Sequence, residues 1–341
     1  MNLSVRANDL IKQVTTGKEH IKFTVGVIHK GKTDFKLFDS KGEIPYESYQ
    51  YEMGSIGKTF TTSLLAKYIH AGKMDLNDSV AKYIPELESN NYYPTLKRLA
   101  THTAGYPSRY PADDFGELFQ MIWKKIRNKP IKLSDYLTMD KKKMIRLATE
   151  SNVQDRDYKW MYSNFGIALL GYAISNVAKK SFFELLTNYF NDDLGLKNSF
   201  VGDNHKNLLR GYDMKNRDVG NWGFAETECI IPAGACMVSN AEDLLEFARL
   251  NFEESLDYLS LCHVSQGVSS ESKKWGLAWE MGLGWWISKK NPNVIFHGGN
   301  TSGFATMLAF DKQKKASVVL LANVNFYKER EELFMDILEN L

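Results

Sequence analysis

Ser55 and Lys58 stand three residues apart in a Ser-x-x-Lys pattern, a spacing that suits nucleophilic catalysis. We predict a helix that carries both residues, runs to about Ala71 and ends at Gly72. Side chains at positions i and i+3 are neighbours on a helix, so the hydroxyl and the amine can meet. A serine hydroxyl becomes a strong nucleophile when a base takes its proton, and an amine whose pKa is shifted by its surroundings can be that base. The pair therefore indicates a serine acyl-transfer enzyme, with the N–H groups of the helix N-terminus available to an oxyanion.

The same pattern occurs at Ser79–Lys82 and at Ser270–Lys273. For a Ser-x-x-Lys taken alone, the simpler interpretation is a helix N-cap serine followed by a solvated lysine. Ser55 differs from both alternatives because a long helix with apolar periodicity follows it. Its neighbours Gly54, Gly57 and Thr59 are also small or hydroxylated, which lets another backbone approach. Ser55 is therefore the candidate nucleophile.

Other catalytic motifs are excluded by the sequence. Gly57-Lys58-Thr59 resembles the end of a phosphate-binding loop, but Glu52 occupies the position of that loop's first glycine, and a carboxylate would repel phosphate. The Gly-x-Ser-x-Gly elbow of α/β-hydrolases and the His-Glu-x-x-His zinc motif do not occur in the chain. Histidines are scattered singly and cysteines lack metal-ligand spacing, so no metal or organic cofactor is expected.

Tyr162 and Asn164 precede a predicted helix, Phe165–Ala178. A tyrosine acts as a general base when a nearby ammonium pulls its pKa down from ~10, and Lys58 would supply that ammonium if the two segments face each other. Asn164 offers both a donor and an acceptor, which suits the orientation of an amide or of the lysine. The simpler interpretation of Tyr162 alone is a packed core tyrosine whose hydroxyl is satisfied.

A third segment, His297-Gly298-Gly299-Asn300, follows a predicted strand. Glycines in a strand mark positions where a backbone or a ligand comes close. An edge strand with accessible N–H groups can hold an extended substrate and supply an oxyanion donor. His297 would lie beside the site as a donor or proton relay, although a lone histidine is more often structural.

The order and spacing of these three segments resemble the class C β-lactamase and penicillin-binding serine hydrolase family. Further segments are similar to that family in the same order, and the resemblance runs from about residue 20 to 325. They are Gly72–Asp78 with Tyr83–Leu87, Leu99-Ala100-Thr101-His102-Thr103-Ala104-Gly105-Tyr106-Pro107, and Pro232–Ala235 with Ser239–Leu244.

The resemblance implies a role for each matching residue. Ser55 would be the acylated nucleophile and Lys58 its proton acceptor or electrostatic activator. Tyr162 would activate Ser55 and then the water that attacks the acyl-enzyme. Asn164 would contact the substrate amide and Lys58, and the backbone N–H groups of Ser55 and Asn300 would form the oxyanion hole.

One departure from the family bears on the substrate. Its β-lactamases and cell-wall peptidases usually have Lys-Thr-Gly on the third strand, where this chain has His297-Gly298-Gly299. A lysine is a permanent cation for a substrate carboxylate, whereas a histidine is largely neutral at pH 7. We therefore expect an esterase or D-amino-acid peptidase rather than a potent β-lactamase. The alternative from another class is a non-catalytic or slowly acylating penicillin-binding sensor module.

Strands are predicted near both ends of the sequence and helices in its middle. The strands are Lys22–His29, Lys32–Asp39, Gly284–Ser288, Val294–His297, Phe304–Phe310 and Ala316–Val324, and the terminal helices are Leu3–Val14 and Lys328–Leu341. We expect an α/β (α+β) fold, with residues 1–74 and 216–341 forming a sheet domain and residues 75–215 a mostly helical one. The active site would lie in the cleft between them. The family resemblance implies that the sheet is antiparallel and flanked by the terminal helices.

Composition sets the remaining expectations. A net charge of +2 on 341 residues is too small to indicate nucleic-acid binding. The N-terminus lacks the apolar core of a signal peptide and no run reaches ~18 apolar residues, so we expect a cytoplasmic, soluble protein without a membrane partner. The expected partner is a small-molecule or short-peptide substrate. The sequence does not specify an oligomeric state.

Overall fold

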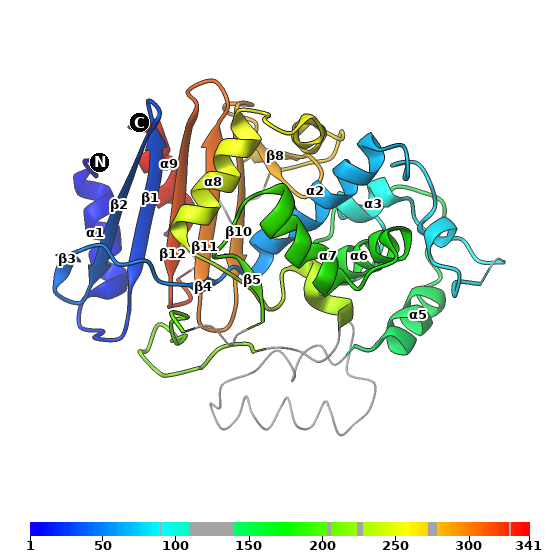
Figure 1. The fold of residues 1–341 in the computed structure, drawn as a ribbon, viewed down its shortest axis with the longest axis horizontal. Helices are drawn as coiled ribbons and strands as arrows, with labels where there is room; N and C mark the ends of the chain where they lie inside the picture. The colour runs from blue at the N-terminus through cyan, green and yellow to red at the C-terminus, as the bar shows by residue number, and fades with distance from the viewer. Residues whose placement is uncertain (89, 109–138, 203–205, 224–227, 272–277, 327–328) are drawn as a thin grey trace.

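The computed structural model describes residues 1–88, 90–108, 139–202, 206–223, 228–271, 278–326 and 329–341. In these residues, both ends of the sequence join one nine-stranded antiparallel sheet (Figure 1). In spatial order its strands are β3 Gly42–Ile44, β2 Lys32–Asp39, β1 Phe23–His29, β12 Ala316–Ala322, β11 Ala305–Asp311, β10 Val294–Asn300, β9 Trp286–Ser288, β8 Ala278–Met281 and β7 Ser269–Glu271. Because β1 pairs with β12, the first long strand lies beside the last, and the prediction of one sheet from both termini is confirmed.

The hairpin of β1 and β2 shows why the N-terminal strands form where the sequence predicts them. Lys30 and Gly31 join the strands and have φ angles of +51° and +73°. Two consecutive positive φ angles match the right-handed twist of the strands that they connect. His29 pairs with Lys32, so the turn contains two residues and fixes the register of the hairpin.

Helices cover both faces of the sheet. On one face lie α1 Val5–Thr15 and α9 Arg330–Glu339, and on the other lies α8 Ala241–Phe252. Alternate residues of β12 therefore enter two different cores: Leu320 packs towards α1 and α9, and Leu321 packs towards α8. A strand buried on both faces is mostly apolar, which explains why β12 has no polar alternation and Ser317 is its one polar residue.

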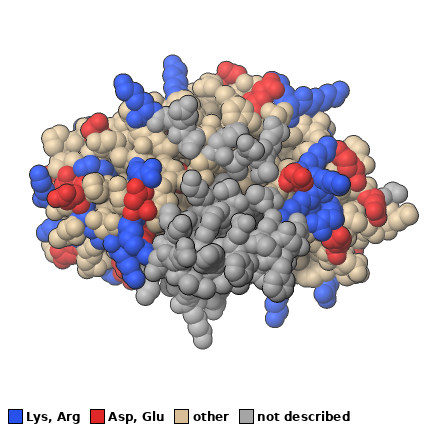
Figure 2. Space-filling view, turned by 90° about the horizontal axis from the view of Figure 1, so that it is seen from below, with Lys and Arg blue, Asp and Glu red and all other residues tan. Residues whose placement is uncertain are grey.

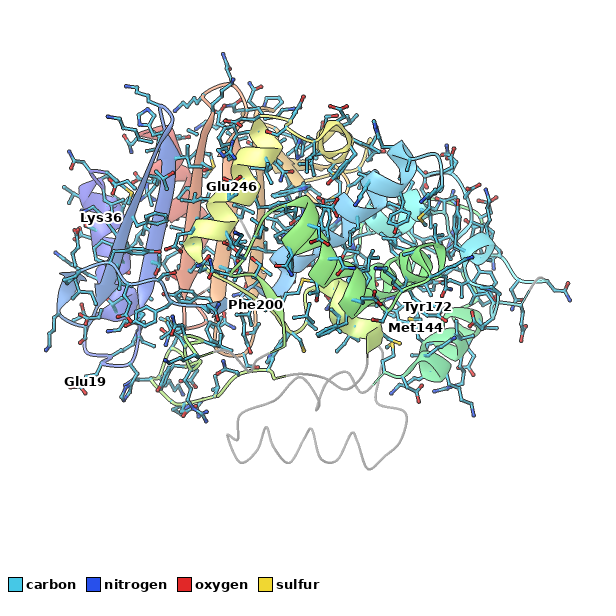
Figure 3. The ribbon with its side chains drawn as sticks, viewed as in Figure 1. Glu19, Lys36, Met144, Tyr172, Phe200 and Glu246 are labelled. Atoms are coloured by element: carbon cyan, nitrogen blue, oxygen red, sulfur yellow. The ribbon has the colours of Figure 1, made fainter. Side chains whose placement is uncertain are left out.

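The rest of the described chain is mostly helical. Its helices and helical turns are η1 Gly54–Ile56, α2 Gly57–His70, η2 Val80–Tyr83, α3 Leu96–Ala100, α5 Lys141–Glu150, α6 Asn164–Ala178, α7 Phe182–Asn188, η4 Tyr189–Asp193, η5 Glu228–Ala233 and η6 Asp257–His263. A small sheet of β4 Tyr51–Glu52, β6 Met237–Ser239 and β5 Phe200–Val201 lies beside them. Figure 3 shows Met144 and Tyr172 on this helical side and Lys36 on the opposite, sheet side.

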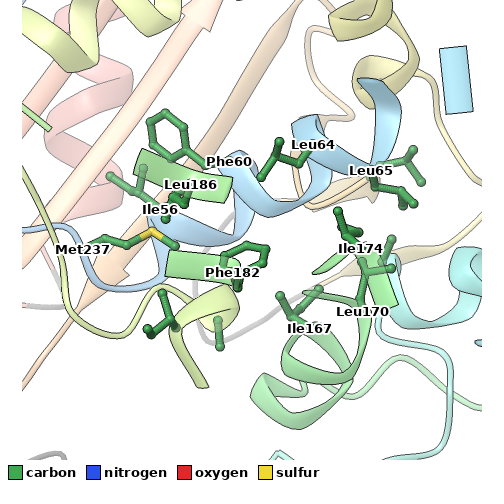
Figure 4. Close-up of a cluster of buried hydrophobic side chains, with 14 of the residues drawn as sticks. Ile56, Phe60, Leu64, Leu65, Ile167, Leu170, Ile174, Phe182, Leu186 and Met237 are labelled. Atoms are coloured by element: carbon green, nitrogen blue, oxygen red, sulfur yellow. The ribbon is translucent and has the colours of Figure 1, made fainter. Parts of the chain in front are cut away.

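Helix α2 runs through the centre of the helical part. Its first ten residues, 57–66, are all buried. Phe60 and Leu64 of α2 and Leu170 of α6 belong to the large core, part of which Figure 4 shows. Hydroxyl side chains tolerate this burial because they donate to backbone carbonyls, as Thr61 Oγ1 does to Pro232 O at 2.6 Å. The first ten residues of the helix that follows the candidate nucleophile are therefore enclosed by packed neighbours.

The described surface mixes charges of both signs. Figure 2 shows acidic and basic side chains interspersed on either side of one face, in keeping with the small net charge. Among the helices that the structure describes, none combines the length and apolar content needed to cross a membrane.

The two alternative Ser-x-x-Lys patterns lie away from the start of α2. Ser79 caps η2, Ser270 lies in β7, and Lys273 falls outside the described residues.

Candidate active site

Ser55 lies on a 3₁₀ turn, η1, that leads directly into α2. We predicted it on the first turn of the helix itself, so the helix begins two residues later than expected, at Gly57. Gly54 precedes Ser55 with a φ of +54°, and a Cβ there would lie 2.7 Å from the backbone nitrogen of Asn300. A glycine is required here because the turn and the end of β10 approach too closely for a side chain. The backbone of Ser55 is thereby held next to that of Asn300.

Lys58 makes a direct contact with Ser55. Its Nζ lies 3.0 Å from Ser55 Oγ and 2.6 Å from the carbonyl oxygen of Ala233. The side chain is fully buried, and this burial lowers the pKa of the ammonium to about 7 because the charged form loses its hydration. A substantial fraction of the amine is thus neutral near pH 7 and can accept the serine proton.

Residues 232–234 pack against the η1 turn that carries Ser55. Gly234 has a φ of +95°, and a Cβ there would lie 2.0 Å from the carbonyl oxygen of Gly54. A Cβ at Gly57 would lie 2.4 Å from the Cα of Gly234. Three glycines therefore let two backbones touch, which places the Ala233 carbonyl against Lys58. Ala233 is a contributor that the motif search missed, although its Pro-Ala-Gly-Ala segment was singled out by the family resemblance.

Tyr162 lies just before α6, whose start is fixed by Ser163. The Ser163 hydroxyl accepts the backbone N–H of Gly166 at 3.0 Å, an N-cap that orients the preceding residues. The Nζ of Lys58 lies 4.8 Å from the centroid of the Tyr162 ring. Three side chains from two distant segments of the sequence, Ser55, Lys58 and Tyr162, therefore form one continuous chain of contacts.

Asn164 is the first residue of α6 and is half-buried. In the described part of the chain its amide makes no hydrogen bond to Lys58, the contact that the family resemblance implied. Lys58 instead donates to Ala233. The structure thus places Asn164 two residues after Tyr162, at the start of α6.

His297 is completely buried on β10. Its ring stacks on that of Trp286 at a centroid distance of 4.6 Å and an interplanar angle of 9°. Its Nδ1 lies 2.8 Å from the carbonyl oxygen of Gly298. Burial, followed by the positive charge of Lys58, holds the pKa of His297 well below its usual value, so the ring is neutral at pH 7.

The strand segment 298–300 is packed tightly by backbone on one side and by a buried arginine on the other. A Cβ at Gly299 would lie 1.9 Å from Met53 O, and a Cβ at Gly298 would lie 2.6 Å from Arg330 Nη2. The pairing of β10 with β9 ends at Phe296, so the following residues lie against η1 in place of a strand. Both glycines are thus explained by close approach.

Arg330, at the start of α9, was not singled out from the sequence because it looks like an ordinary helix residue. It is buried, and its Nη1 donates to Gly299 O at 2.9 Å and to Asn300 Oδ1 at 2.7 Å. Its Nη2 lies 2.7 Å from Glu331 Oε1. This arginine fixes the end of β10 beside the nucleophile.

In the residues described, no cluster of three or more His, Cys, Asp or Glu side chains could hold a metal ion.

Comparisons with known proteins identify the family of the chain. The family model described as Beta-lactamase matches residues 7–340, nearly the whole chain. Protein flp of Staphylococcus aureus (strain MW2) is 25% identical over 284 residues, which are 81% of this chain and 53% of that protein. The chain therefore spans about half the length of this curated relative.

Solved structures show the same fold. A class C beta lactamase from Rhodobacter sphaeroides superposes with a TM-score of 0.76 at 19% identity and covers 99% of both chains. A Beta-Lactamase/D-Alanine Carboxypeptidase from Pseudomonas syringae gives a TM-score of 0.75 at 19% identity, over 98% of this chain and 97% of that one. At such identities the likeness establishes the fold, and function has to be argued from the site.

Proposed function

The chain belongs to the Beta-lactamase family, and we propose that it is a serine hydrolase that forms an acyl-enzyme on Ser55. The observation that carries this proposal is the 3.0 Å contact between Lys58 Nζ and Ser55 Oγ. A buried lysine with a pKa of about 7 has a neutral amine available beside the hydroxyl, which is what activation of a serine requires.

The proposed acylation follows from these positions. Ser55 Oγ attacks the substrate carbonyl carbon while its proton passes to Lys58 Nζ. The negative charge that develops on the carbonyl oxygen is stabilised by the backbone N–H groups of Ser55 and Asn300, at the N-terminus of α2 and the end of β10. Tyr162, in contact with Lys58, then delivers a proton to the leaving group.

Deacylation reverses the direction of proton transfer. A water molecule loses a proton to Tyr162 as its oxygen attacks the acyl carbon, and Ser55 leaves with the proton returned through Lys58. Asn164, half-buried beside Tyr162, supplies an amide that can orient the acyl group. Each role rests on contact or proximity within the cluster, and no cofactor is needed for the proton balance.

For the substrate, we favour an ester or a short D-amino-acid peptide over a β-lactam. The support is the neutral, buried ring of His297, at the position where the family resemblance implies a lysine in β-lactamases and cell-wall peptidases. Without that cation, recognition of a substrate carboxylate on this side of the site is weakened.

Intact-mass spectrometry with a fluorophosphonate tests the nucleophile. We expect one adduct on the wild-type chain and none on Ser55→Ala. An adduct that persists in Ser55→Ala, or its absence from the wild type, contradicts the mechanism. Turnover of p-nitrophenyl esters, D-alanyl peptides and nitrocefin then ranks the substrate classes. A chain that acylates with each of them and never turns over would be a sensor module instead.

A further inference from the structure

The loop that contains His102 runs alongside the segment that presents Tyr162. The backbone N–H of Met161 donates to His102 O at 2.9 Å, and the backbone N–H of Ser163 donates to His102 Nδ1 at 3.2 Å. His102 therefore binds the residue before Tyr162 with its carbonyl and the residue after it with its ring. No other described residue brackets Tyr162 in this way.

His102 adopts a backbone conformation that few residues favour. Its φ is +60°, in the left-handed region, and its side chain is 2% exposed. Its ring centroid lies 4.6 Å from that of Tyr162 and 6.2 Å from that of Trp160. A strained backbone that holds a buried imidazole against a catalytic side chain points to function, because packing alone could be met by an apolar residue without the polar cost.

The hydrogen-bond partners fix where each ring carries its proton. His102 Nδ1 accepts an N–H, so the neutral ring carries its hydrogen on Nε2. His297 Nδ1 faces a carbonyl oxygen, so its hydrogen is on Nδ1 and its Nε2 holds a lone pair. The two imidazoles are thus opposite tautomers, one with a donor and one with an acceptor at Nε2. Both Nε2 atoms are buried without a hydrogen-bond partner in the described residues.

Both rings adjoin the tyrosine and remain neutral. The His297 ring centroid lies 6.5 Å from that of Tyr162. The charged group that acts on both rings is the Lys58 ammonium, from α2, and Arg330 of α9 also acts on His297. Burial, followed by the Lys58 ammonium, lowers the pKa of His102 to about 3. Neither histidine is therefore expected to exchange a proton during turnover.

We propose that His102 is a positioning residue of the reaction, whose Nε2–H, paired with the His297 Nε2 lone pair, holds the Tyr162 hydroxyl directly or through one water. The proposal rests on the proposed function, in which Tyr162 shuttles a proton. Its oxygen therefore alternates between a phenol and a phenolate. The phenolate requires a hydrogen-bond donor and the phenol requires an acceptor. One fixed donor and one fixed acceptor serve both states, and in an unliganded site such contacts are commonly longer than in the working complex.

His102→Asn is the decisive variant. Its Oδ1 can accept the Ser163 N–H in place of Nδ1, and asparagine tolerates a positive φ, so the Nε2–H is removed while both backbone contacts of His102 are kept. A lost donor makes Tyr162 a weaker acid towards the leaving group. We expect hydrolysis of an ethyl ester, whose leaving group needs a proton, to fall about 10-fold or more further than hydrolysis of the matching p-nitrophenyl ester. The falling limb of the pH–rate profile, where Tyr162 loses the proton that it must deliver, should also move to higher pH, because the phenolate is less favoured.

A purely structural role would lower both rates equally and leave the limb in place, and that result overturns the proposal. Folding is compared by thermal unfolding. If His102→Asn does not fold, His102→Gly, which also suits the φ, is assayed with added imidazole or 1-methylimidazole. We expect rescue by imidazole alone, because 1-methylimidazole has no N–H to donate once its free nitrogen accepts from Ser163. Equal rescue by the two bases, or by neither, rejects the inference. Failure of Ser55 acylation in the wild type would instead reject the proposed function.

Discussion

The Ala233 carbonyl oxygen and Ser55 Oγ both contact Lys58 Nζ, at 2.6 Å and 3.0 Å. A carbonyl can only accept, so it must receive an N–H from Lys58. A neutral amine then has its lone pair left for the remaining close partner, the serine hydroxyl. The Ala233 carbonyl therefore accepts a hydrogen bond from Lys58 and orients the amine towards Ser55. The backbone contact of Gly234 with Gly54 holds the carbonyl and the serine in place.

This arrangement predicts that acylation follows the ionisation of Lys58. The pKa is lowered by burial to about 7, so the amine is protonated and inactive as a base well below that pH. We expect the rate of Ser55 acylation, measured by stopped flow between pH 5 and 9, to rise with a midpoint near 7. Lys58→Arg, which stays charged, should lose about 10²–10⁴ in this rate at every pH. A fast, pH-independent Lys58→Arg enzyme would exclude Lys58 as the base.

The close contact between Gly54 and Asn300 predicts a specific loss in turnover. In Gly54→Ala the new Cβ would meet the Asn300 backbone nitrogen at 2.7 Å and must displace β10. Misplacing one oxyanion donor costs about 10²–10³ in kcat, so we expect a loss of that size with little change in KM. Gly72→Ala is the matched control, because Gly72 also has a positive φ of +67° and nothing within 4 Å of the added Cβ. Equal losses in the two variants would show that backbone strain alone is responsible.

Six strands and the three candidate segments follow from local patterns in the sequence, whereas the short strands β3 to β8 carry too little alternation to be predicted. Alternation and a Lys30-Gly31 turn specify the hairpin, and the Ser-x-x-Lys spacing brings Ser55 to Lys58 within one turn. Contacts across long sequence separations could not be predicted in this way. Arg330 reaches Gly299 from a different element, and nothing in its neighbourhood distinguishes it from a surface arginine.

His102 shows a second limit. Its segment resembles the family, but the sequence indicates no role for the histidine itself, because a histidine in a loop carries no periodicity. The N–H groups of Met161 and Ser163, which donate to the His102 carbonyl and to its Nδ1, and the ring contact with Tyr162 show what it touches. The polar connections of the site thus become visible once the tertiary structure places the segments together.

The buried pair of Arg330 and Glu331 predicts a separation of stability from activity. Arg330→Met leaves the Glu331 carboxylate buried without its partner, which should cost about 3–5 kcal/mol in the free energy of unfolding. The double variant Arg330→Met/Glu331→Gln removes both charges and should regain most of that loss. Its kcat/KM should remain low, because Gly299 O and Asn300 Oδ1 still lack their donor. Urea unfolding measures the stability and ester hydrolysis measures kcat/KM. If the double variant recovered both, Arg330 would have only a structural role.

Three buried histidines predict acid sensitivity of the fold. Burial lowers the pKa of His102 and His263 to about 3, and that of His297 well below its usual value. The unfolded chain binds protons at these residues as the pH falls through about 6.5, whereas the folded chain does not, so stability is lost as the pH falls. Each histidine should cost about 1 kcal/mol between pH 7 and 5.5.

Urea unfolding at the two pH values measures this loss. His263→Gln is the control variant, since His263 lies away from the site and its Nε2 contacts Asn251. It should reduce the pH dependence by about one histidine's share. A pH dependence that His263→Gln leaves unchanged would show that buried histidines are not its source.

The neutral ring of His297 predicts how selectivity can be altered. In His297→Lys a cation would replace the imidazole, and turnover of nitrocefin, which bears a carboxylate, should rise about 10-fold relative to that of a neutral p-nitrophenyl ester. Stability should fall, because the stacking on Trp286 is lost and a third positive group joins Lys58 and Arg330. His297→Met is the matched control, since it also removes the ring without adding charge, and its ratio of nitrocefin to ester turnover should not rise above the wild-type value. If a folded His297→Lys chain keeps that same ratio, the missing cation is not what limits lactam recognition.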